Sequence, residues 1–284
     1  MSIIETKNLT HIYGSGTPFE RVAINDINFS AEKGECIGII GATGSGKSTF
    51  LQHLNGLLKP TSGNVFFDEK DIHESKTYTR QIRFKVGLVF QYPEYQLFEA
   101  TVFDDIAFGP KNMGLGDSEV RERVYEAAGF VHLHESVMQK SPFELSGGQK
   151  RRAAIAGVMA MMPEVLILDE PTAGLDPRGR HDIVKNIMAY KEAVNATLIV
   201  VSHNMDDIVR SIEKLYVFEN GNIVLQGSPA EVFSDDVRLH DMGLATPKMM
   251  MVAARLRALG LPLPHDILTR NQLRKELVKL MAKK

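Results

Sequence analysis

The sequence predicts an α/β fold built on a parallel sheet, and three apolar segments carry this prediction. Residues 36–40, 165–168 and 197–201 are short, mostly apolar runs, the pattern of parallel strands that are covered on both faces. Ligands bind at the carboxyl ends of such strands in open α/β sheets. Asp169 and Glu170, which directly follow the second run, are therefore expected to reach a functional site.

The first of these runs leads into a phosphate-binding loop. Residues 41–48, with the sequence GATGSGKS, match the pattern G-x-x-x-x-G-K-[ST], whose backbone N–H groups point into one concavity at the start of a helix. Lys47 is expected to reach the β- and γ-phosphates of a nucleotide, Ser48 to hold Mg²⁺, and Thr49 to contact the α-phosphate. The helix is expected to end at a capping glycine, Gly56. The predicted nucleotide contacts in this loop are Gly41, Thr43, Gly44, Ser45, Gly46, Lys47, Ser48 and Thr49.

A second glycine-rich segment, residues 145–149 with the sequence LSGGQ, precedes another expected helix. Ser146 and Gln149 fit a capping box for the helix through residues 150–156. A cap does not need the two adjacent glycines between them, whereas a backbone that must approach a phosphate does.

Together these segments make the chain resemble the ATP-binding-cassette (ABC) ATPases, in which the LSGGQ segment faces ATP held by another subunit. The resemblance implies an ABC-type nucleotide-binding domain of the P-loop NTPase fold. This domain has a RecA-like core with an antiparallel β subdomain and a helical subdomain, here followed by a small C-terminal helical extension. The bound cofactors implied are ATP and Mg²⁺. The ATP contacts that the resemblance adds are Ser146, Gly147, Gly148 and Gln149.

Four more residues match catalytic positions of ABC ATPases. Neighbouring side chains on an extended segment point in opposite directions, so Asp169 and Glu170 cannot share one role; a pair that only caps the next turn is the alternative. By resemblance, Asp169 holds Mg²⁺ and Glu170 polarises the attacking water as a general base. Gln91, which follows the apolar run 86–90, and His203 match residues that contact the γ-phosphate, the glutamine also sensing Mg²⁺. The implied catalytic residues are Glu170, His203 and Gln91, and the implied Mg²⁺ ligands are Ser48, Gln91 and Asp169.

Two further matches to the family each have a structural alternative. Tyr13 matches the aromatic residue that stacks on adenine, but it is also compatible with an ordinary half-buried strand aromatic. Asp176 matches the residue that communicates across the dimer. Because Asp176-Pro177 is also a common helix start, the cap and the dimer contact can both be true.

Composition narrows the class of protein. With 284 residues, of which 44% are hydrophobic, the chain can bury a large core. The 33 basic and 35 acidic residues give a net charge of −2, so the composition shows no excess of positive charge that would indicate nucleic-acid binding. The single cysteine, Cys36, is expected to be an inert core thiol. A signal-peptide pattern and an apolar stretch of ~18 residues are both missing, so we expect a protein made in the cytosol.

Three longer segments narrow the resemblance within the ABC ATPases. Residues 90–98 (FQYPEYQLF), 105–112 (DIAFGPKN) and 141–149 (SPFELSGGQ) are similar to the ATPases of energy-coupling factor (ECF) importers. The segments 16–20, 43–44 and 156–159 favour the second of the two ATPases in these importers, the A-prime type, although Ala42 stands where that type is expected to have histidine.

This resemblance implies a subunit that binds and hydrolyses ATP to energise uptake of vitamins or other micronutrients. The implied partners are a paralogous ATPase, with a homodimer as the alternative, a transmembrane scaffold (T) component and interchangeable substrate-binding (S) components. The implied location is the cytoplasmic face of the cell membrane. A soluble ABC ATPase that acts as a regulator or assembly factor is the competing hypothesis.

The expected domain organisation follows from the motifs. Residues 1–240 are expected to form the ABC domain, with the helical subdomain at about 92–162, and residues 241–284 a helical dimerisation extension. The loop after Gln91 carries four large apolar side chains that either dock the scaffold or pack inward. In the extension, a helix capped at Thr246 and a helix with a capping box at Thr269 either cover their own core or join two subunits. The apolar residues concerned are Tyr92, Tyr95, Leu97 and Phe98 in the loop, and Met249, Val252, Ala253, Leu256, Leu259, Leu273, Leu277 and Leu280 in the extension.

Overall fold

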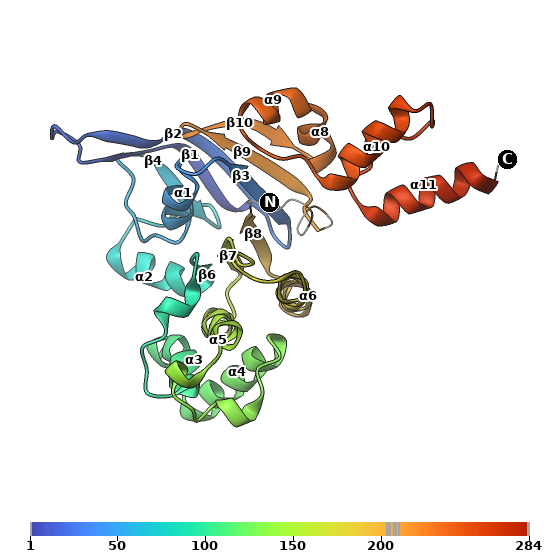
Figure 1. Cartoon of the computed structure of the whole chain (residues 1–284). Helices are drawn as coiled ribbons and strands as arrows, with labels where there is room; N and C mark the ends of the chain where they lie inside the picture. The colour runs from blue at the N-terminus through green and yellow to red at the C-terminus, as the bar shows by residue number, and fades with distance from the viewer. Residues whose placement is uncertain (1, 203–205, 207–208, 210, 283–284) are drawn as a thin grey trace.

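The computed structural model describes residues 2–202, 206, 209 and 211–282, which form two sheets with helices around them (Figure 1). The larger sheet has the strand order β10-β9-β3-β8-β7-β6. All of its neighbouring strands are parallel except β10, which forms an antiparallel hairpin with β9. The predicted parallel sheet is thereby confirmed. Its strands are β3 (Cys36–Gly41), β6 (Val86–Val89), β7 (Val165–Asp169), β8 (Thr197–Val201), β9 (Lys214–Glu219) and β10 (Asn222–Gly227).

Each central strand is buried on both faces, which explains why its sequence is continuously apolar. In β3, Ile37 and Ile39 pack into one hydrophobic cluster, while Cys36 and Ile40 pack into another on the opposite face. This alternation follows from the two-residue period of a strand. Burial raises the pKa of Cys36 to about 12, so the thiol is protonated at neutral pH, as expected for an inert core residue.

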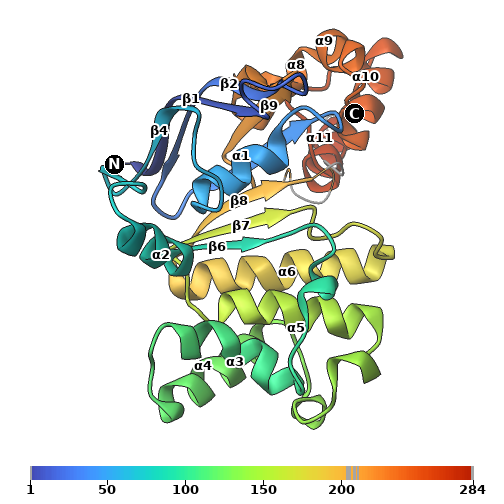
Figure 2. The same ribbon diagram turned by 90° about the vertical axis from the view of Figure 1, so that its left-hand side faces the viewer.

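The smaller sheet is antiparallel, with the order β2-β1-β4-β5. It covers one face of helix α1 (Lys47–Leu54), whose other face packs on the larger sheet (Figure 2). Phe50 and Leu54 of α1 are fully buried in the cluster between the two sheets. This packing fixes the helix that follows the phosphate-binding loop against both sheets. The strands are β1 (Ser2–Tyr13), β2 (Arg21–Glu32), β4 (Ser62–Phe67) and β5 (Lys70–Asp71).

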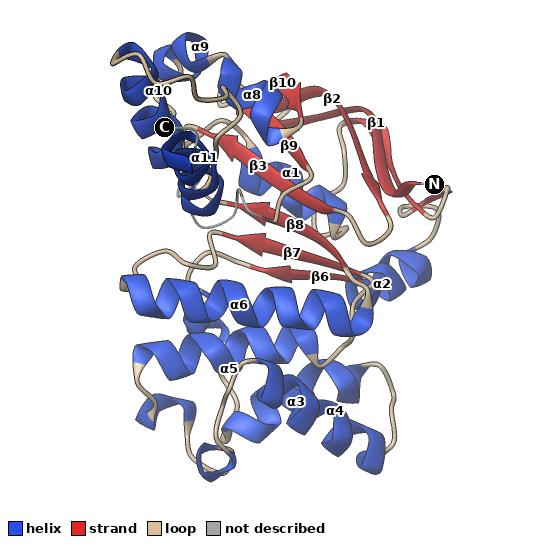
Figure 3. Ribbon diagram, turned by 90° about the vertical axis from the view of Figure 1, so that its right-hand side faces the viewer, coloured by secondary structure: helices blue, strands red, loops and turns tan. Residues whose placement is uncertain are grey.

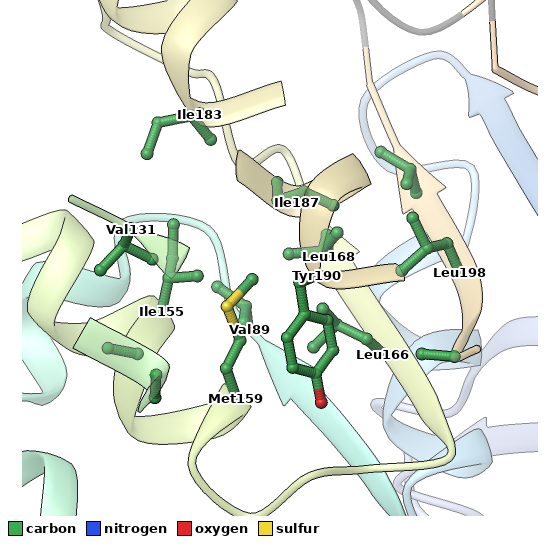
Figure 4. Packing of buried hydrophobic residues seen from close by; sticks show 14 of the residues in the cluster. Val89, Val131, Ile155, Met159, Leu166, Leu168, Ile183, Ile187, Tyr190 and Leu198 are labelled. Carbon is green, nitrogen blue, oxygen red and sulfur yellow. The ribbon is translucent and has the colours of Figure 1, made fainter. Parts of the chain in front are cut away.

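Helices cover the other face of the parallel sheet and form a layer below it (Figure 3). Tyr190 of α6 lies between Met159 of α5 and Leu166 of β7, and the three belong to one hydrophobic cluster (Figure 4). This cluster joins the helical layer to the sheet. The helices up to this point are α2 (Lys76–Lys85), α3 (Val102–Asn112), α4 (Asp117–Phe130), α5 (Gly147–Met159) and α6 (Pro177–Val194), with short 3₁₀ turns at η1 (Pro93–Gln96), η2 (Glu135–Val137) and η3 (Pro142–Glu144).

The last part of the chain adds four helices, of which the final two extend to one side of the molecule (Figure 1). Helix α10 begins one residue later than expected: Pro247 precedes it and gives no side-chain cap, so the predicted cap at Thr246 is wrong. The capping box at Thr269 is confirmed, since Gln272 N donates to the Thr269 hydroxyl and Gln272 Oε1 accepts from Thr269 N. These helices are α8 (Pro229–Ser234), α9 (Asp236–Asp241), α10 (Lys248–Ala258) and α11 (Arg270–Ala282).

The expected apolar stripe of α10 is only partly covered. Ala253 is fully buried in a small cluster with Leu273 of α11, and Leu256 packs at its edge. Val252 and Leu259 are 39% and 77% exposed, because α11 covers the face centred on Ala253. The extension thus has a small core of its own and also an exposed apolar part. Within the described ranges, no helix is both long and apolar enough to cross a membrane.

Candidate functional site

The phosphate-binding loop joins β3 to α1, and the surrounding backbone requires two of its glycines. Gly41 has a φ of 156°, and a Cβ there would lie 2.3 Å from the carbonyl oxygen of Phe218 on β9. Gly46, directly before α1, has a φ of 102°, and a Cβ there would lie 2.5 Å from the carbonyl oxygen of Ala23 on β2. Backbone atoms of both sheets therefore lie too close to the loop to leave room for a side chain, and only glycine fits these two positions.

The ammonium group of Lys47 turns back into this loop. Its Nζ donates hydrogen bonds to the carbonyl oxygens of Gly41 at 2.8 Å and Ala42 at 2.9 Å. Burial lowers the pKa of Lys47 below its usual value, while the carboxylates of Asp169 and Glu170 act in the opposite direction. The loop thus places a cation beside the concavity in which the motif predicts phosphates.

Asp169 and Glu170 have different partners at the end of β7. The Ser48 hydroxyl donates to Asp169 Oδ2 at 2.8 Å, and Gln91 Nε2 donates to Glu170 Oε2 at 3.0 Å. Glu170 has a φ of 51°, a left-handed conformation that ends the strand at this residue. The two carboxylates thus have different partners, although Glu170 does not continue the extended segment on which the prediction is based.

The oxygen atoms at this strand end suit Mg²⁺. The Ser48 hydroxyl and the Asp169 carboxylate are hard ligands that already lie within hydrogen-bond distance of each other. Mg²⁺ usually takes only one or two carboxylates and completes its shell with water and substrate phosphates. Among the described residues there is no group of three or more histidine, cysteine or acidic side chains that could hold a metal ion.

A cavity of about 200 Å³ opens over the phosphate-binding loop and reaches the end of β1. Tyr13 lies at its rim, 42% exposed, with its hydroxyl 3.3 Å from the Thr49 hydroxyl. Sequence reasoning missed two wall residues, Arg21 and Ala23 of β2; the pairing of Tyr13 with Arg21 across β1 and β2 brings them here. A hairpin between the segments on either side of residues 14–20 would have indicated them. The lining residues are Tyr13, Arg21, Ala23, Gly44, Gly46, Lys47, Ser48 and Thr49.

The LSGGQ segment lies outside this cavity. Ser146 and Gln149 form the predicted capping box at the start of α5. An added Cβ at Gly147 or Gly148 would meet no atom of the described residues within 4 Å. The chain's own packing therefore does not require either glycine.

The remaining predicted residues lie apart from the cavity or outside the described structure. Asp176 caps α6 and accepts a hydrogen bond from the backbone N of Gly179 at 2.6 Å, with Pro177 in the first turn. The helix-start interpretation of Asp176 is thus confirmed, and its dimer contact stays a prediction. His203 is one of the residues that the structure does not describe.

A buried arginine connects three of the predicted segments, and sequence reasoning missed it. Arg151 of α5 is 3% exposed, and its Nε and Nη2 donate to the two carboxylate oxygens of Glu94 at 3.1 and 3.0 Å. Its Nη1 also donates to the carbonyl oxygens of Pro171 and Ala173. The LSGGQ helix is thereby fastened to the turn after Gln91 and to the turn after Glu170.

Comparisons with known proteins agree on the family. The profile of the family described as ABC transporter matches residues 24–173. The energy-coupling factor transporter ATP-binding protein EcfA2 of Caldanaerobacter subterraneus subsp. tengcongensis is 51% identical over 278 residues, covering 98% of this chain and 97% of that protein. The protein of the same name from Clostridium tetani is 50% identical over 282 residues, covering 99% and 98%.

Solved structures show the same fold. The structure of cbiO1 from Clostridium perfringens, described as part of the ABC transporter complex cbiONQ, matches with a TM-score of 0.74 and 40% identity over 84% of this chain and 94% of that chain. An ATP-binding cassette solved as a dimer in a post-hydrolysis state with ADP and Pi matches with a TM-score of 0.72 and 28% identity over 79% and 98%. The motifs, the fold and these relatives together show that the chain belongs to the ABC transporter family and, within it, to the ATP-binding subunits of energy-coupling factor transporters.

Proposed function

We propose that this chain binds ATP with Mg²⁺ over its phosphate-binding loop and hydrolyses it as one of two ATPase subunits of an ECF-type importer. The observation that carries the proposal is the pair of contacts at the end of β7, Ser48 with Asp169 and Gln91 with Glu170. In the proposal, Ser48 and Asp169 are the metal-binding pair, and Glu170 is the base that accepts a hydrogen bond from Gln91. These groups lie at the same edge of the sheet as Lys47.

Each of these residues has a separate role in the proposed reaction. Lys47 exchanges its two carbonyl partners for the β- and γ-phosphate oxygens. Ser48 and Asp169, with Gln91, hold Mg²⁺, which when bound neutralises charge on the phosphates. Glu170 accepts a hydrogen bond from the attacking water and takes up its proton. Gln91 orients the carboxylate of Glu170 by donating to one of its oxygens.

We assign the LSGGQ segment to the ATP of the second ATPase. Gly147 and Gly148 leave space that no described part of this chain fills, and the capping box makes the N-terminus of α5 a rigid donor of backbone N–H groups. An anion outside the chain can therefore approach this helix end closely. The relative solved as a dimer with ADP and Pi supports a two-subunit arrangement.

The loop after Gln91 is proposed to dock the membrane scaffold. Tyr95 and Phe98 are 86% and 61% exposed, whereas Leu97 packs inward against the helical core. Phe98 meets the ring of Phe108 at a centroid distance of 5.0 Å, beside an open groove of about 410 Å³. Exposed aromatic side chains beside a groove suit a partner's amphipathic helix.

The wider arrangement follows from the same proposal. Residues 1–240 act as the ABC domain, with the helical subdomain at about 92–162, and residues 241–284 act as the dimerisation extension. The second ATPase is a paralogue, the scaffold is a transmembrane protein, and interchangeable S components bring the substrate. This assembly keeps the chain peripheral, on the cytoplasmic face of the membrane. The name of the curated relatives, which assigns them to a transporter, favours it over a soluble regulator.

Copurification from native cells tests the assembly. The tagged full-length chain is recovered from detergent-solubilised membranes and its partners are identified by mass spectrometry. We expect an integral membrane protein and a second ABC ATPase. Recovery of soluble partners alone would contradict the importer and support the regulator.

Turnover in the purified complex tests the chemistry. Glu170→Gln is expected to retain ATP affinity, abolish turnover and trap a closed dimer, because the amide cannot take up a proton. Lys47→Ala is expected to weaken both binding and turnover. Glu164→Gln is the matched control, since Glu164 lies directly before the same strand, at its opposite end, and pairs with Lys85. Near-normal activity of Glu170→Gln would remove Glu170 from its role.

A further inference from the structure

Two histidines connect Tyr13 to the helix of the phosphate-binding loop. The rings of His11 and Tyr13, two residues apart on β1, meet edge to face at a centroid distance of 4.5 Å and an interplanar angle of 80°. His11 Nδ1 lies 3.2 Å from Nε2 of His53, which is fully buried on α1. The Tyr13 hydroxyl, at the other end of the ring, lies 3.3 Å from the Thr49 hydroxyl. Tyr13 is thus connected to α1 directly at Thr49 and, through His11, at His53 one turn later.

The hydrogen bonds allow only one arrangement of protons in this pair. His53 Nδ1 lies 2.8 Å from the carbonyl oxygen of Thr49, which can only accept, so Nδ1 carries the proton. Burial lowers the pKa of His53 to about 4, and the ring is therefore neutral at physiological pH, with Nε2 as an acceptor. His11 must then donate from its Nδ1. The hydrogen bond from His11 Nδ1 thus anchors its ring to a buried group inside the protein.

We propose that His11, held by His53, is a positioning residue for the nucleobase, because it fixes the plane of the Tyr13 ring at the rim of the cavity. The inference rests on the proposed function, in which Tyr13 stacks on adenine. A single tyrosine at the end of β1, 42% exposed, loses side-chain freedom when a base stacks on it. A ring that is already held by His11 and Thr49 has less freedom left to lose, so the base binds more tightly.

The competing explanation is that the histidine pair only fastens β1 to α1. The two explanations differ in which part of the ligand they affect. Loss of a fastening would disturb the phosphate-binding loop, and with it the binding of any polyphosphate. Loss of the ring position would weaken binding of the base and leave phosphate binding intact.

Calorimetric titration of the full-length chain separates these effects, using MgATP and magnesium tripolyphosphate, which has no base. We expect His11→Ala to raise the Kd for ATP about three- to tenfold, the range of one aromatic pair, and to leave the Kd for tripolyphosphate within about twofold. His11→Asn keeps a δ-positioned N–H for His53 but removes the ring, so it should weaken ATP binding equally while protecting the fold. His134→Ala, which alters a surface histidine bonded to Ser136, is the control and should change neither constant.

A double-variant cycle with Tyr13→Ala completes the test. In the Tyr13→Ala background, His11→Ala should cause no further loss of ATP affinity, because the ring that it positions is absent. Three outcomes would each overturn the inference. His11→Ala could lower the affinities for ATP and tripolyphosphate equally, or leave the Kd for ATP unchanged. Alternatively, the losses of ATP affinity from His11→Ala and Tyr13→Ala could simply add in the double variant. If Tyr13→Ala itself leaves the ATP Kd unchanged, the stacking role of Tyr13 falls as well, whereas a Tyr13 effect without a His11 effect overturns the positioning role alone.

Discussion

Removal of the guanidinium group of Arg151 is expected to destabilise the chain more than removal of any exposed ion pair would. The group is 3% exposed and donates to both carboxylate oxygens of Glu94 and to two backbone carbonyl oxygens. Arg151→Met keeps most of the side-chain volume, so the change isolates the loss of charge and hydrogen bonds. Breaking a buried pair by removing one partner costs about 3–5 kcal/mol. The Glu94 side chain is 21% exposed and can recover some hydration, which places the expected cost at about 3 kcal/mol.

The assay is urea unfolding of the full-length chain, followed by circular dichroism. Glu94→Gln, whose amide oxygen still accepts from Arg151, should cost only about 1 kcal/mol. The double variant should cost less than the sum of the single variants by about 1–3 kcal/mol, because the residues share one network. Arg123→Met, which removes an i,i+4 pair with the 48%-exposed Glu119 and a hydrogen bond to the carbonyl oxygen of Met161, is the control and should cost about 1 kcal/mol. An Arg151→Met cost no larger than that of Arg123→Met would refute the argument.

Three further predictions concern the second ATP, the extension and pH. In a mixed dimer, Gly147→Asp should disable hydrolysis of the partner's ATP by charge repulsion at a poorly screened site and spare nucleotide binding to this chain; photolabelling of each subunit with azido-ATP checks this, and loss of labelling on this chain alone would contradict it. A chain that ends at residue 240 should pair only when ATP is bound, whereas pairing without nucleotide in light scattering would show that the extension covers only itself. Because the folded pKa of His53 is about 4 against a usual 6.5, the unfolded chain binds the extra proton as pH falls below 6.5. Stability is therefore fully present above pH 6.5 and decreases toward pH 4, by about 2 kcal/mol between pH 7.5 and 5. In urea unfolding, the free energy of unfolding of His53→Asn should not show this decrease. An equal pH dependence in His53→Asn and the unaltered chain would contradict the prediction.

The features that the sequence predicts well are local ones. The phosphate-binding loop, the capping box of Ser146 and Gln149, and the capping box at Thr269 each depend on residues within a few positions of one another. The continuous apolar runs locate the parallel strands because both faces of the sheet are covered. These signals do not depend on how distant segments pack.

The contacts that the sequence does not reveal join residues far apart in the chain. Arg151 meets Glu94 across 57 positions, and His11 meets His53 across 42. Nothing in the composition of either segment specifies its partner, because the pairing depends on how α5 packs on the turn after Gln91 and how α1 packs on β1. The extension illustrates the same limit: the helical period places Val252, Ala253 and Leu259 on one apolar face of α10, but of these three only Ala253 is buried, under α11.

The inward position of Lys47 bears on how quickly nucleotide can enter. Two backbone carbonyl oxygens and the Ser45 hydroxyl accept hydrogen bonds from the ammonium group, so the loop itself pairs this partly buried charge. Entry of the nucleotide then requires exchange of three hydrogen bonds on one side chain, a rotamer change on the nanosecond scale. No segment of the loop has to fold first. The association rate should therefore be set by diffusion and electrostatic steering, and any slow phase on nucleotide addition should come from subunit closure and depend on the concentration of the partner.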